Sequence, residues 1–516
     1  MAKLTDLPAE PVHRIIHYLH YPDPQPLPHG YQRSKPRDEH HLLDHTEINS
    51  SLKPLPRPHE ERYIDRGPNY PIPYSDKVTW PGGRPNNPCL PLALINQTFR
   101  LCAQERLFKN VTFENTWTAS LFLKSLISIS HEDASSHKRQ PIDTQVEQYN
   151  PHPRLNRLSQ YVRSLQFDWG DKCSMRKGGG SMFCKILEIC PLLDNIAISS
   201  TFLLACKEPI LQALASTRHI KEILILKNAS GQNSTFRWQA HEVVTRLFSQ
   251  LNSLKTVELS DLSSWPTQSS YKPALHSSLP MPKLNCAIRT IVLKDHDLDE
   301  LTLSNLLKSC GDSMRTLKLT GPGHRLDREA FDRVLHGSTS RNLECLIMLQ
   351  SSGFQQPPYF SSDDLGSDDP LTTPGLLDIV FSSPTALRKL RTLSFYGRHM
   401  ATDRLFARLP KSLVKLSWER SRISASPLLQ ALSSSRDQEA SLPNLKCCSV
   451  LLCHAWDAKD ERAIEQALKK RGGCFHPLVD PAYGSPSSTT HGDDDYSYDP
   501  YEHQDWYQEY LVTGTY

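Results

Sequence analysis

Features that mark secreted or membrane proteins are missing from the sequence. No apolar stretch approaches the roughly 18 residues that a membrane-spanning helix needs. The first ten residues have no basic region followed by an apolar run, so we expect no signal peptide. The 13 cysteines are odd in number and never form a Cys-x-x-Cys pair, which argues against a disulfide framework. We therefore expect a soluble intracellular protein, cytoplasmic or nuclear, with no membrane partner.

An excess of charge of one sign is also missing. Lys and Arg number 59 against 56 Asp and Glu, so the chain has no electrostatic signature of nucleic-acid binding. No Gly-x-Ser-x-Gly, His-Glu-x-x-His or dinucleotide-binding motif occurs. The sequence therefore indicates no enzyme activity, no catalytic residues and no cofactor. An unrecognised enzyme is a distant alternative, because the residues of a catalytic triad meet in space and not in sequence.

Three cysteines near the end of the chain could suggest a nucleophile or a metal site. Cys447, Cys448 and Cys453 lie on or beside a predicted strand, inside an apolar pattern. Small, buried thiols are common in protein cores. We interpret these three as core residues and expect no bound metal.

Proline, by contrast, is abundant, and its 39 residues concentrate in a few stretches. Residues 21–89 are dense in proline, histidine and charge, and no apolar period continues through them. This composition favours a disordered insertion. The 516 residues leave room for more than one folded domain on either side of it.

Amphipathic segments flank the insertion. Asp6 can cap a helix whose first turn holds Pro8, and Val12, Ile15, Ile16 and Leu19 share one face of that helix. After the insertion, residues 90–103 again predict an amphipathic helix. Residues 104–113 predict a short helix that runs into a strand. Helices this short need a partner surface.

These two segments resemble the halves of an F-box. Residues 1–20 contain a Leu-Pro-x-Glu opening and an Ile-Ile-x-x-Leu helix, and residues 90–113 end on Leu-Phe-x-x-Val. The resemblance implies a three-helix module that docks on the Skp-type adaptor of SCF ubiquitin ligases. It implies packing or adaptor contact for Leu7, Pro8, Ile15, Ile16, Leu19, Leu92, Ile95, Phe99 and Leu107.

The sequence departs from the family in the connection between the halves, which is normally a short loop. The cost of closing a loop rises only logarithmically with its length, so a long insertion is tolerable. An alternative interpretation is that these are ordinary amphipathic helices that cap the following domain.

A six-residue pattern, apolar-x-x-apolar-x-apolar, recurs ten times from about residue 161. The repeats span residues 162–167, 193–198, 220–225, 254–259, 288–293, 314–319, 343–348, 390–395, 413–418 and 445–450. Most intervals lie in the twenties to low thirties, which is typical of leucine-rich repeats, and helical segments fill the gaps.

The pattern predicts an α/β fold, a leucine-rich-repeat solenoid with parallel strands on the concave side and helices outside. The competing fold is a doubly wound α/β domain, which also alternates strands and helices. The predicted organisation has a helical linker over residues 114–160, degenerate repeats over 161–476 and an acidic, aromatic tail over 477–516.

Strand alternation indicates where a client would bind. Residues at alternate positions, among them Gln166, Glu222, Glu258 and Lys318, should face the concave side. The residue after the first apolar position is usually basic, and stacking should align these side chains in a column that attracts acidic partners. The column comprises Arg163, Lys221, Lys255, Arg289, Arg315, Arg391 and Lys446. A further hypothesis is that the acidic tail lies against it.

Together, these expectations describe a non-enzymatic substrate receptor of an SCF-type ubiquitin ligase. Its partners would be a Skp-type adaptor, a cullin scaffold and an unknown protein client. The alternative is a leucine-rich-repeat scaffold or signalling protein that acts outside any ubiquitin ligase, because repeat surfaces are generic binding sites.

Overall fold

The computed structural model describes fifteen segments and four single positions of the chain. They are residues 7–20, 89–113, 115–127, 157–167, 179–199, 207–226, 238–264, 284–320, 328–349, 374–383, 387–397, 400–419, 423–433, 441–452 and 456–479, with 175, 282, 326 and 421. Residues 1–478 form one compact unit, and residues 479–516 form a second, of which only Val479 is described. The predicted insertion and the tail beyond Val479 thus lie outside the described residues, apart from Cys89.

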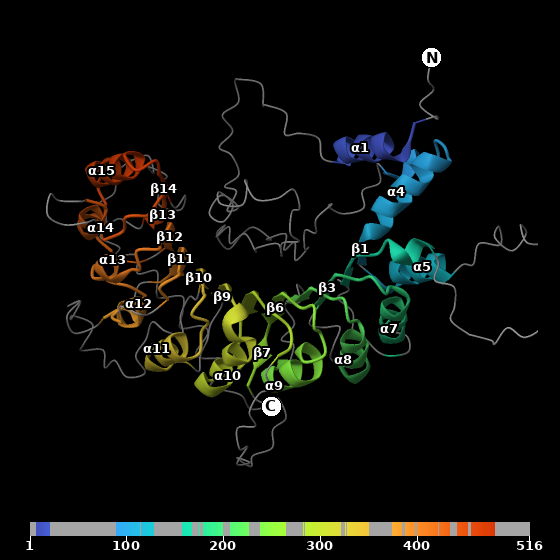
Figure 1. The fold of residues 1–516 in the computed structure, drawn as a ribbon, viewed down its shortest axis with the longest axis horizontal. Helices are drawn as coiled ribbons and strands as arrows, with labels where there is room; N and C mark the ends of the chain where they lie inside the picture. Colours follow the sequence, from blue (N-terminus) through green and yellow to red (C-terminus); the bar gives the residue numbers. More distant parts are fainter. Residues whose placement is uncertain are drawn as a thin grey trace, which may run out of the picture. The chain divides into compact units, whose positions relative to one another are not determined.

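A twelve-stranded sheet organises the larger unit (Figure 1). Its strands are β1 (Asn110–Phe113), β2 (Ser164–Phe167), β3 (Asn195–Ser199), β4 (Glu222–Leu226), β6 (Thr256–Ser260), β8 (Thr290–Lys294), β9 (Thr316–Thr320), β10 (Cys345–Leu349), β11 (Thr392–Tyr396), β12 (Lys415–Glu419), β13 (Cys447–Leu452) and β14 (Cys474–Val479). Every pair from β1 to β13 is parallel. A separate two-stranded sheet joins β5 (Trp238–Gln239) and β7 (Leu262–Ser263).

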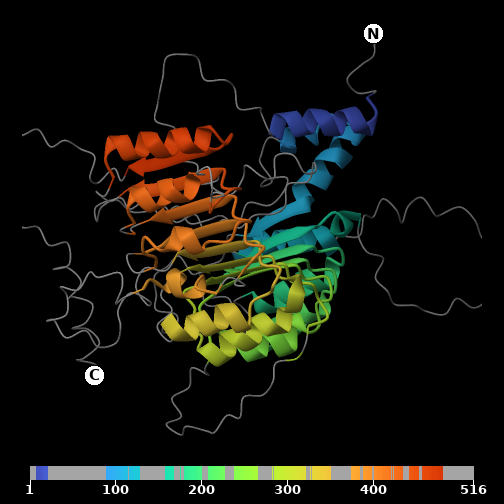
Figure 2. The ribbon, with the colours of Figure 1, turned by 60° about the vertical axis from the view of Figure 1, so that its left-hand side comes forward.

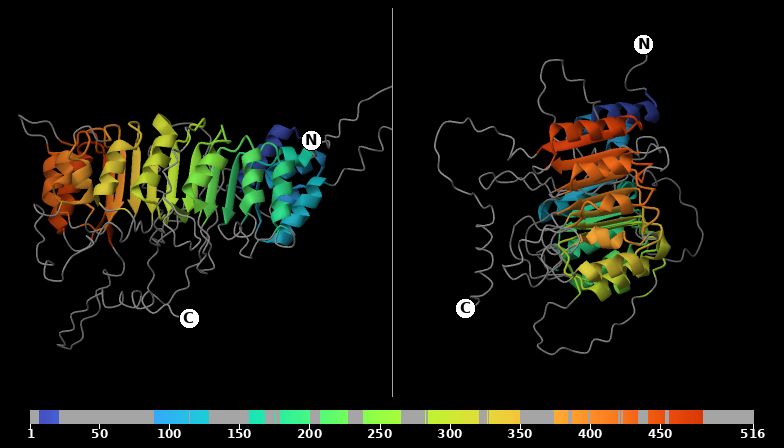
Figure 3. Two further views of the ribbon diagram at one scale, coloured as in Figure 1. Left: turned by 90° about the horizontal axis from the view of Figure 1, so that it is seen from below. Right: turned by 90° about the vertical axis from the view of Figure 1, so that its left-hand side faces the viewer.

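Helices connect most of the successive strands and lie on one side of the sheet (Figure 3). They are α7 (Gly180–Ile189), α8 (Lys207–Ser216), α9 (Ala240–Glu242), the π-helix η4 (Val243–Phe248), α10 (Glu300–Cys310), the short 3-10 helix η5 (Gly311–Ser313), α11 (Arg328–Gly337), α12 (Leu376–Val380), α13 (Leu405–Arg408), α14 (Ala425–Leu432) and α15 (Ala458–Lys469).

The core lies between the sheet and these helices. Alternate strand residues point into it, as Leu165 and Phe167 of β2 do. Aromatic contacts connect the layers: the Phe167 and Phe183 rings lie 4.5 Å apart, and the Trp418 ring lies 5.6 Å from that of Phe406. A strand and a helix bury little alone, so stacking successive units creates the core.

The strands follow one another in chain order, from β1 to β14, without reversal. A doubly wound domain requires a reversal of strand order, so this competing fold does not fit. The arrangement is α/β with a parallel sheet, and it is compatible with a solenoid-like fold. All ten predicted strands are present, each beginning two residues after the first apolar position. β1 and β14 extend the sheet at its two ends.

The N-terminal helices are α1 (Ala9–His20), α3 (Cys89–Leu92), α4 (Gln97–Lys109) and α5 (Thr116–Ile127), and a 3-10 helix, η2 (Arg157–Gln160), precedes β2. The expectation of one helix over residues 90–103 was wrong. The chain turns after α3, and the Asn96 side chain accepts a 2.8 Å hydrogen bond from the Phe99 N–H, which starts α4. α4 then continues through the predicted second helix, and β1 follows it directly.

Candidate functional site

Two surfaces could bind other proteins, and the first is on the helical module, defined here as α1, α3 and α4. Helix α1 lies beside α4 (Figure 2). The core between them consists of Val12 and Ile16 from α1 and Phe99, Cys102 and Ala103 from α4. Polar contacts join the same helices: the Cys102 thiol lies 3.9 Å from the Ala9 carbonyl, and His13 Nε2 lies 3.6 Å from Glu105 Oε2. The two segments that flank residues 21–88 therefore pack against each other.

The nine predicted adaptor-contact residues fall into groups by exposure. Ile16 and Phe99 are buried in the module core, and Pro8 and Ile95 are exposed. Partly buried against the core are Leu7, Ile15, Leu92 and Leu107. Leu19 lies in α1, but its side chain is outside the described residues. The buried residues position the module, and the exposed and half-buried ones can contact a partner.

Sequence reasoning missed most of the exposed apolar side chains. Of the six large hydrophobic residues that are exposed in the described part of the chain, five lie between residues 94 and 127. They are Leu94, at 88% exposure, and Ile95, Trp117, Leu121 and Ile127; the sixth is Leu301 on α10. Trp117 and Leu121 stand four residues apart on α5, a spacing that a helical projection would have revealed. Leu94 and Ile95 are adjacent in the turn between α3 and α4, so these two side chains are the candidates for protein contact on the module.

The second surface is the helix-free face, defined as the sheet face opposite the helices. Its residues alternate with the core residues along each strand, so Gln166 lies between the core positions 165 and 167. Glu222, Glu258 and Lys318 also lie on this face. All four side chains are buried, so they are not exposed as client-binding residues would be. Five hydrophobic residues there are buried yet do not belong to the core cluster: Ala197, Leu224, Val292, Ile347 and Cys447.

Buried ionisable side chains distinguish the middle of the helix-free face. Glu258 is only 1% exposed, and its Oε1 lies 2.7 Å from Lys294 Nζ on the next strand. Burial raises the pKa of Glu222 to about 8, against a smaller opposing effect of a hydrogen bond with Thr256. The Glu222 carboxyl is therefore mostly protonated at neutral pH. Sequence alternation indicates the face of these residues and gives no sign of their burial.

The predicted column of basic residues, here called the basic row, is present as a main-chain stack. The Lys255 N–H donates to the Lys221 carbonyl, Arg289 to Lys255, and Arg315 to Arg289, each at 2.8 Å. The stack continues through Glu344 to Arg391 and through Val414 to Lys446. At the other end, Asp194 lies between Arg163 and Lys221.

Acidic neighbours neutralise part of the basic row. Lys221 Nζ lies 2.8 Å from Asp194 Oδ1, and Arg315 Nε lies 3.4 Å from Glu344 Oε1. Lys255 and Arg289, between these pairs, are exposed, and within the described part of the chain no ion pair involves them. The centre of the row therefore carries the positive charge that can attract an acidic partner.

The interpretation of the three late cysteines holds only in part. Cys448 is fully buried in the core, as predicted. Cys447, one residue earlier, points to the helix-free face, so it is not part of the core between sheet and helices. Cys453 is outside the described residues.

Comparison with known proteins gives no further guide to the function of these surfaces. No family model matches the sequence, and no curated protein matches it. Among the described helices, none has the length and apolar character to cross a membrane.

Proposed function

We propose that this protein is a substrate receptor of an SCF-type ubiquitin ligase. The helical module binds a Skp-type adaptor, which connects it to a cullin scaffold. The sheet is a degenerate leucine-rich-repeat domain whose helix-free face and basic row hold a protein client. The protein itself performs no chemistry in this proposal.

The observation that carries the proposal is the packing of α1 on α4. The F-box resemblance is divided between residues 1–20 and residues 90–113, and it has functional meaning only if both halves fold together. Val12 and Ile16 share one core with Phe99, Cys102 and Ala103, as that resemblance requires. The core is small, and apolar side chains are exposed beside it, which is the condition of a module that acquires stability from a partner.

The repeat assignment is supported by the agreement of motif and topology. Each occurrence of the six-residue pattern coincides with one strand, and the strands add to the sheet in chain order. A helical segment follows most of them. These are properties of repeat proteins in which each unit contacts only its neighbours.

The adaptor assignment can be tested by co-purification with a Skp-type adaptor and a cullin. Leu94→Asp and Ile95→Asp place a charge on exposed positions, so they should abolish adaptor binding while the protein stays folded. Leu301→Asp is the matched control, because Leu301 is an equally large exposed residue on α10 and should leave binding unchanged.

A second set of variants tests the two-part module. Replacing residues 22–88 with a short Gly/Ser linker should preserve adaptor binding, whereas Ile15→Asp or Leu92→Asp should abolish it, because both residues pack against the module core. Loss of binding in the linker variant, or binding by both Asp variants, would overturn the assignment.

The client surface has its own test, which needs no adaptor. Reversing the charge at the centre of the basic row, in the variant Lys255→Glu/Arg289→Glu, should weaken capture of an acidic client by tenfold or more and reduce the salt dependence of binding. Lys308→Glu changes an exposed charge on the helix side, at α10, and should have little effect. Crosslinks from a captured client that fall mainly on the helices would refute the choice of face.

The alternative function is a scaffold that uses the same repeats outside a ligase. It is favoured if the client binds through the basic row while neither adaptor nor cullin co-purifies. The adaptor tests and the client test separate these possibilities, because the former depend on the helical module and the latter depends on the sheet.

A further inference from the structure

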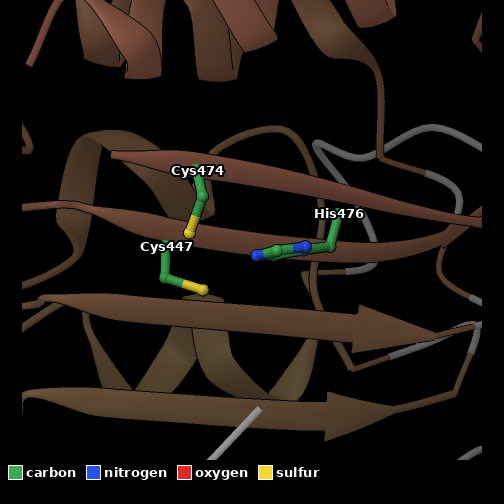
Figure 4. A group of neighbouring side chains, drawn as sticks. All are labelled: Cys447, Cys474 and His476. Carbon is green, nitrogen blue, oxygen red and sulfur yellow. The ribbon is translucent and has the colours of Figure 1, made fainter. Parts of the chain in front are cut away.

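Three potential metal ligands converge at the last two strands of the sheet. Cys447 lies on β13, and Cys474 and His476 lie on β14 (Figure 4). One ligand atom from each residue, the two sulfurs and an imidazole nitrogen, lies within 4.8 Å of the others. Cys447 is buried, and the other two are half-buried. In Figure 4 the two thiols and the histidine ring extend toward a common point above the strands.

Strand geometry brings these residues together. Cys474 and His476 are two residues apart, so strand alternation places both on the same face of β14. The Cys474 N–H donates to the Lys446 carbonyl at 2.7 Å, which sets β14 beside the start of β13. The ligands thus come from one face of two adjacent strands, and their backbone positions are fixed by the sheet.

Two consecutive glycines allow β14 to lie close to β13. Gly472 has a φ of 68°, in the left-handed region that favours glycine, and it turns the chain after α15. At Gly473, a Cβ atom would lie 2.3 Å from the Lys446 carbonyl oxygen. Any larger residue at Gly473 would therefore push β14 away from β13.

The donor set matches the preferences of zinc. Two cysteine thiolates and one histidine are common zinc ligands, and a site with three protein ligands leaves a fourth position open. Tetrahedral ligands at about 2.0–2.3 Å from zinc lie roughly 3.5–3.8 Å from one another. Because the ligand atoms lie within 4.8 Å of one another, metal binding requires a closure of at most about 1 Å, which side-chain rotation can supply.

A buried lysine next to the cluster gives independent support. Lys415 on β12 is the direct register partner of Cys447, and it is 6% exposed. Its Nζ atom has no hydrogen-bond partner in the described part of the chain. An ammonium group buried without a partner is unfavourable, and a metal-bound thiolate at Cys447 would provide the acceptor. Because two thiolates balance the charge of Zn²⁺, the nearby positive charge is compatible with a bound metal.

We propose that Cys447, Cys474 and His476 bind one zinc ion, with Lys415 donating a hydrogen bond to the Cys447 thiolate. The ion joins β14, the edge strand of the described sheet, to β13. The site does not depend on the ligase function, because it lies at the opposite end of the strand order from the helical module.

Metal analysis of the full-length protein, purified under reducing conditions, tests the site. We expect one equivalent of zinc per chain, and cobalt substitution should give a thiolate-to-cobalt charge-transfer band. The variants Cys447→Ser, Cys474→Ser and His476→Ala should lose the band and the zinc. Cys345→Ser is the matched control, because Cys345 lies in the same row of the helix-free face on β10 and should retain both.

Two further variants test the surroundings while all three ligands remain. Lys415→Met should lower zinc affinity by about 10–100-fold, the usual effect of removing a group that hydrogen-bonds a ligand. Gly473→Ala should lower it comparably by displacing β14. For wild-type protein, zinc should raise the melting temperature and slow amide exchange in β14, and a chelator should reverse both.

The proposal is overturned if the reduced protein binds no zinc above the level of the ligand variants. It is equally overturned if Cys345→Ser lowers binding as much as Cys447→Ser does. A Cys447–Cys474 disulfide that persists in reducing buffer and excludes the metal would replace the zinc site with a covalent link.

Discussion

The helical module and the sheet differ in how many residues stabilise each of them. Five buried residues form the module core, whereas a single cluster extends through the sheet from Val111 to Leu468. Their exposed surfaces differ as well: the module exposes the large apolar side chains of Leu94 and Ile95, and basic residues line the sheet. The module has the smaller core and exposes more large apolar side chains. We therefore expect the module to need a bound partner for its stability, and the sheet to be stable without one.

The largest expected effect is on the sheet core. The Trp418 ring packs against Phe406 at 5.6 Å, Trp456 at 5.8 Å and Phe395 at 6.3 Å. Trp418→Ala should lower the free energy of unfolding by about 3–5 kcal/mol, through lost burial and a new cavity. Urea unfolding followed by far-ultraviolet circular dichroism measures this loss. Phe99→Ala in the module should leave the main transition unchanged; equal shifts for both variants would mean that the two regions unfold as one.

The buried ion pair on the helix-free face should have the next largest effect. Glu258→Gln leaves Lys294 charged and little exposed, so we expect a loss of about 3 kcal/mol. The double variant Glu258→Gln/Lys294→Met removes both charges and should recover most of that loss. A double-variant cycle in urea measures the coupling, and additive losses would show that the two side chains do not interact. The module has no charge pair so deeply buried among its described residues.

A third effect depends on pH. The Glu222 carboxyl has a pKa of about 8 in the folded protein, against an ordinary value of 4.5. Below about pH 4.5 the carboxyl is protonated in both states. Between pH 4.5 and 8 only the unfolded state releases the proton, so stability falls with rising pH, by at most about 1.4 kcal/mol per unit. Above pH 8 the contribution is constant.

The variant Glu222→Gln isolates this contribution. The stability of wild-type protein minus that of Glu222→Gln should decline from pH 5 to pH 8, as thermal or urea unfolding can measure. A difference that does not change with pH would show that the carboxyl is ionised in the folded sheet.

The smallest expected effect comes from removing a helix cap, and one cap in each region can be compared. Asn96 caps α4 by accepting from the Phe99 N–H, and Asp299 caps α10 by accepting from the Thr302 N–H, both at 2.8 Å. Asn96→Ala and Asp299→Ala should each cost about 1 kcal/mol. In a hydrogen-exchange experiment, Asn96→Ala should lower amide protection only in the module, and Asp299→Ala should lower it around α10. Added adaptor should restore protection to the Asn96 variant alone.

The sheet could be predicted well because its pattern is local. Each repeat places apolar residues at fixed positions, and this identified ten strands of the sheet. The expected starts were two residues early because the first apolar residue, such as Leu193 or Leu254, packs in the core before the hydrogen-bonded ladder begins. β14 was missed because it contains Pro477 and lacks the six-residue pattern.

Features that depend on neighbouring strands could not be read from the sequence. The grouping of Cys447 with Cys474 and His476 requires knowing that β14 adds next to β13 and in which register. The burial of Glu258 depends on the strands on both sides, which local alternation does not describe. Within the module, the cap at Asn96 was overlooked, although an Asn before a helical pattern is a common start signal.

Strand order in the sheet has a consequence for how substitutions combine. Because each strand pairs only with the strands on either side of it in the sheet, substitutions on strands that are at least three places apart share no partner strand. Neighbouring strands lie about 4.8 Å apart. When two substituted sites are more than about 7–10 Å apart, their effects on the free energy of unfolding usually add. Substitutions on β2 and β12 should therefore be energetically independent. Residues on one strand could then diverge through evolution without compensation elsewhere, so that the surface of the sheet can change one strand at a time.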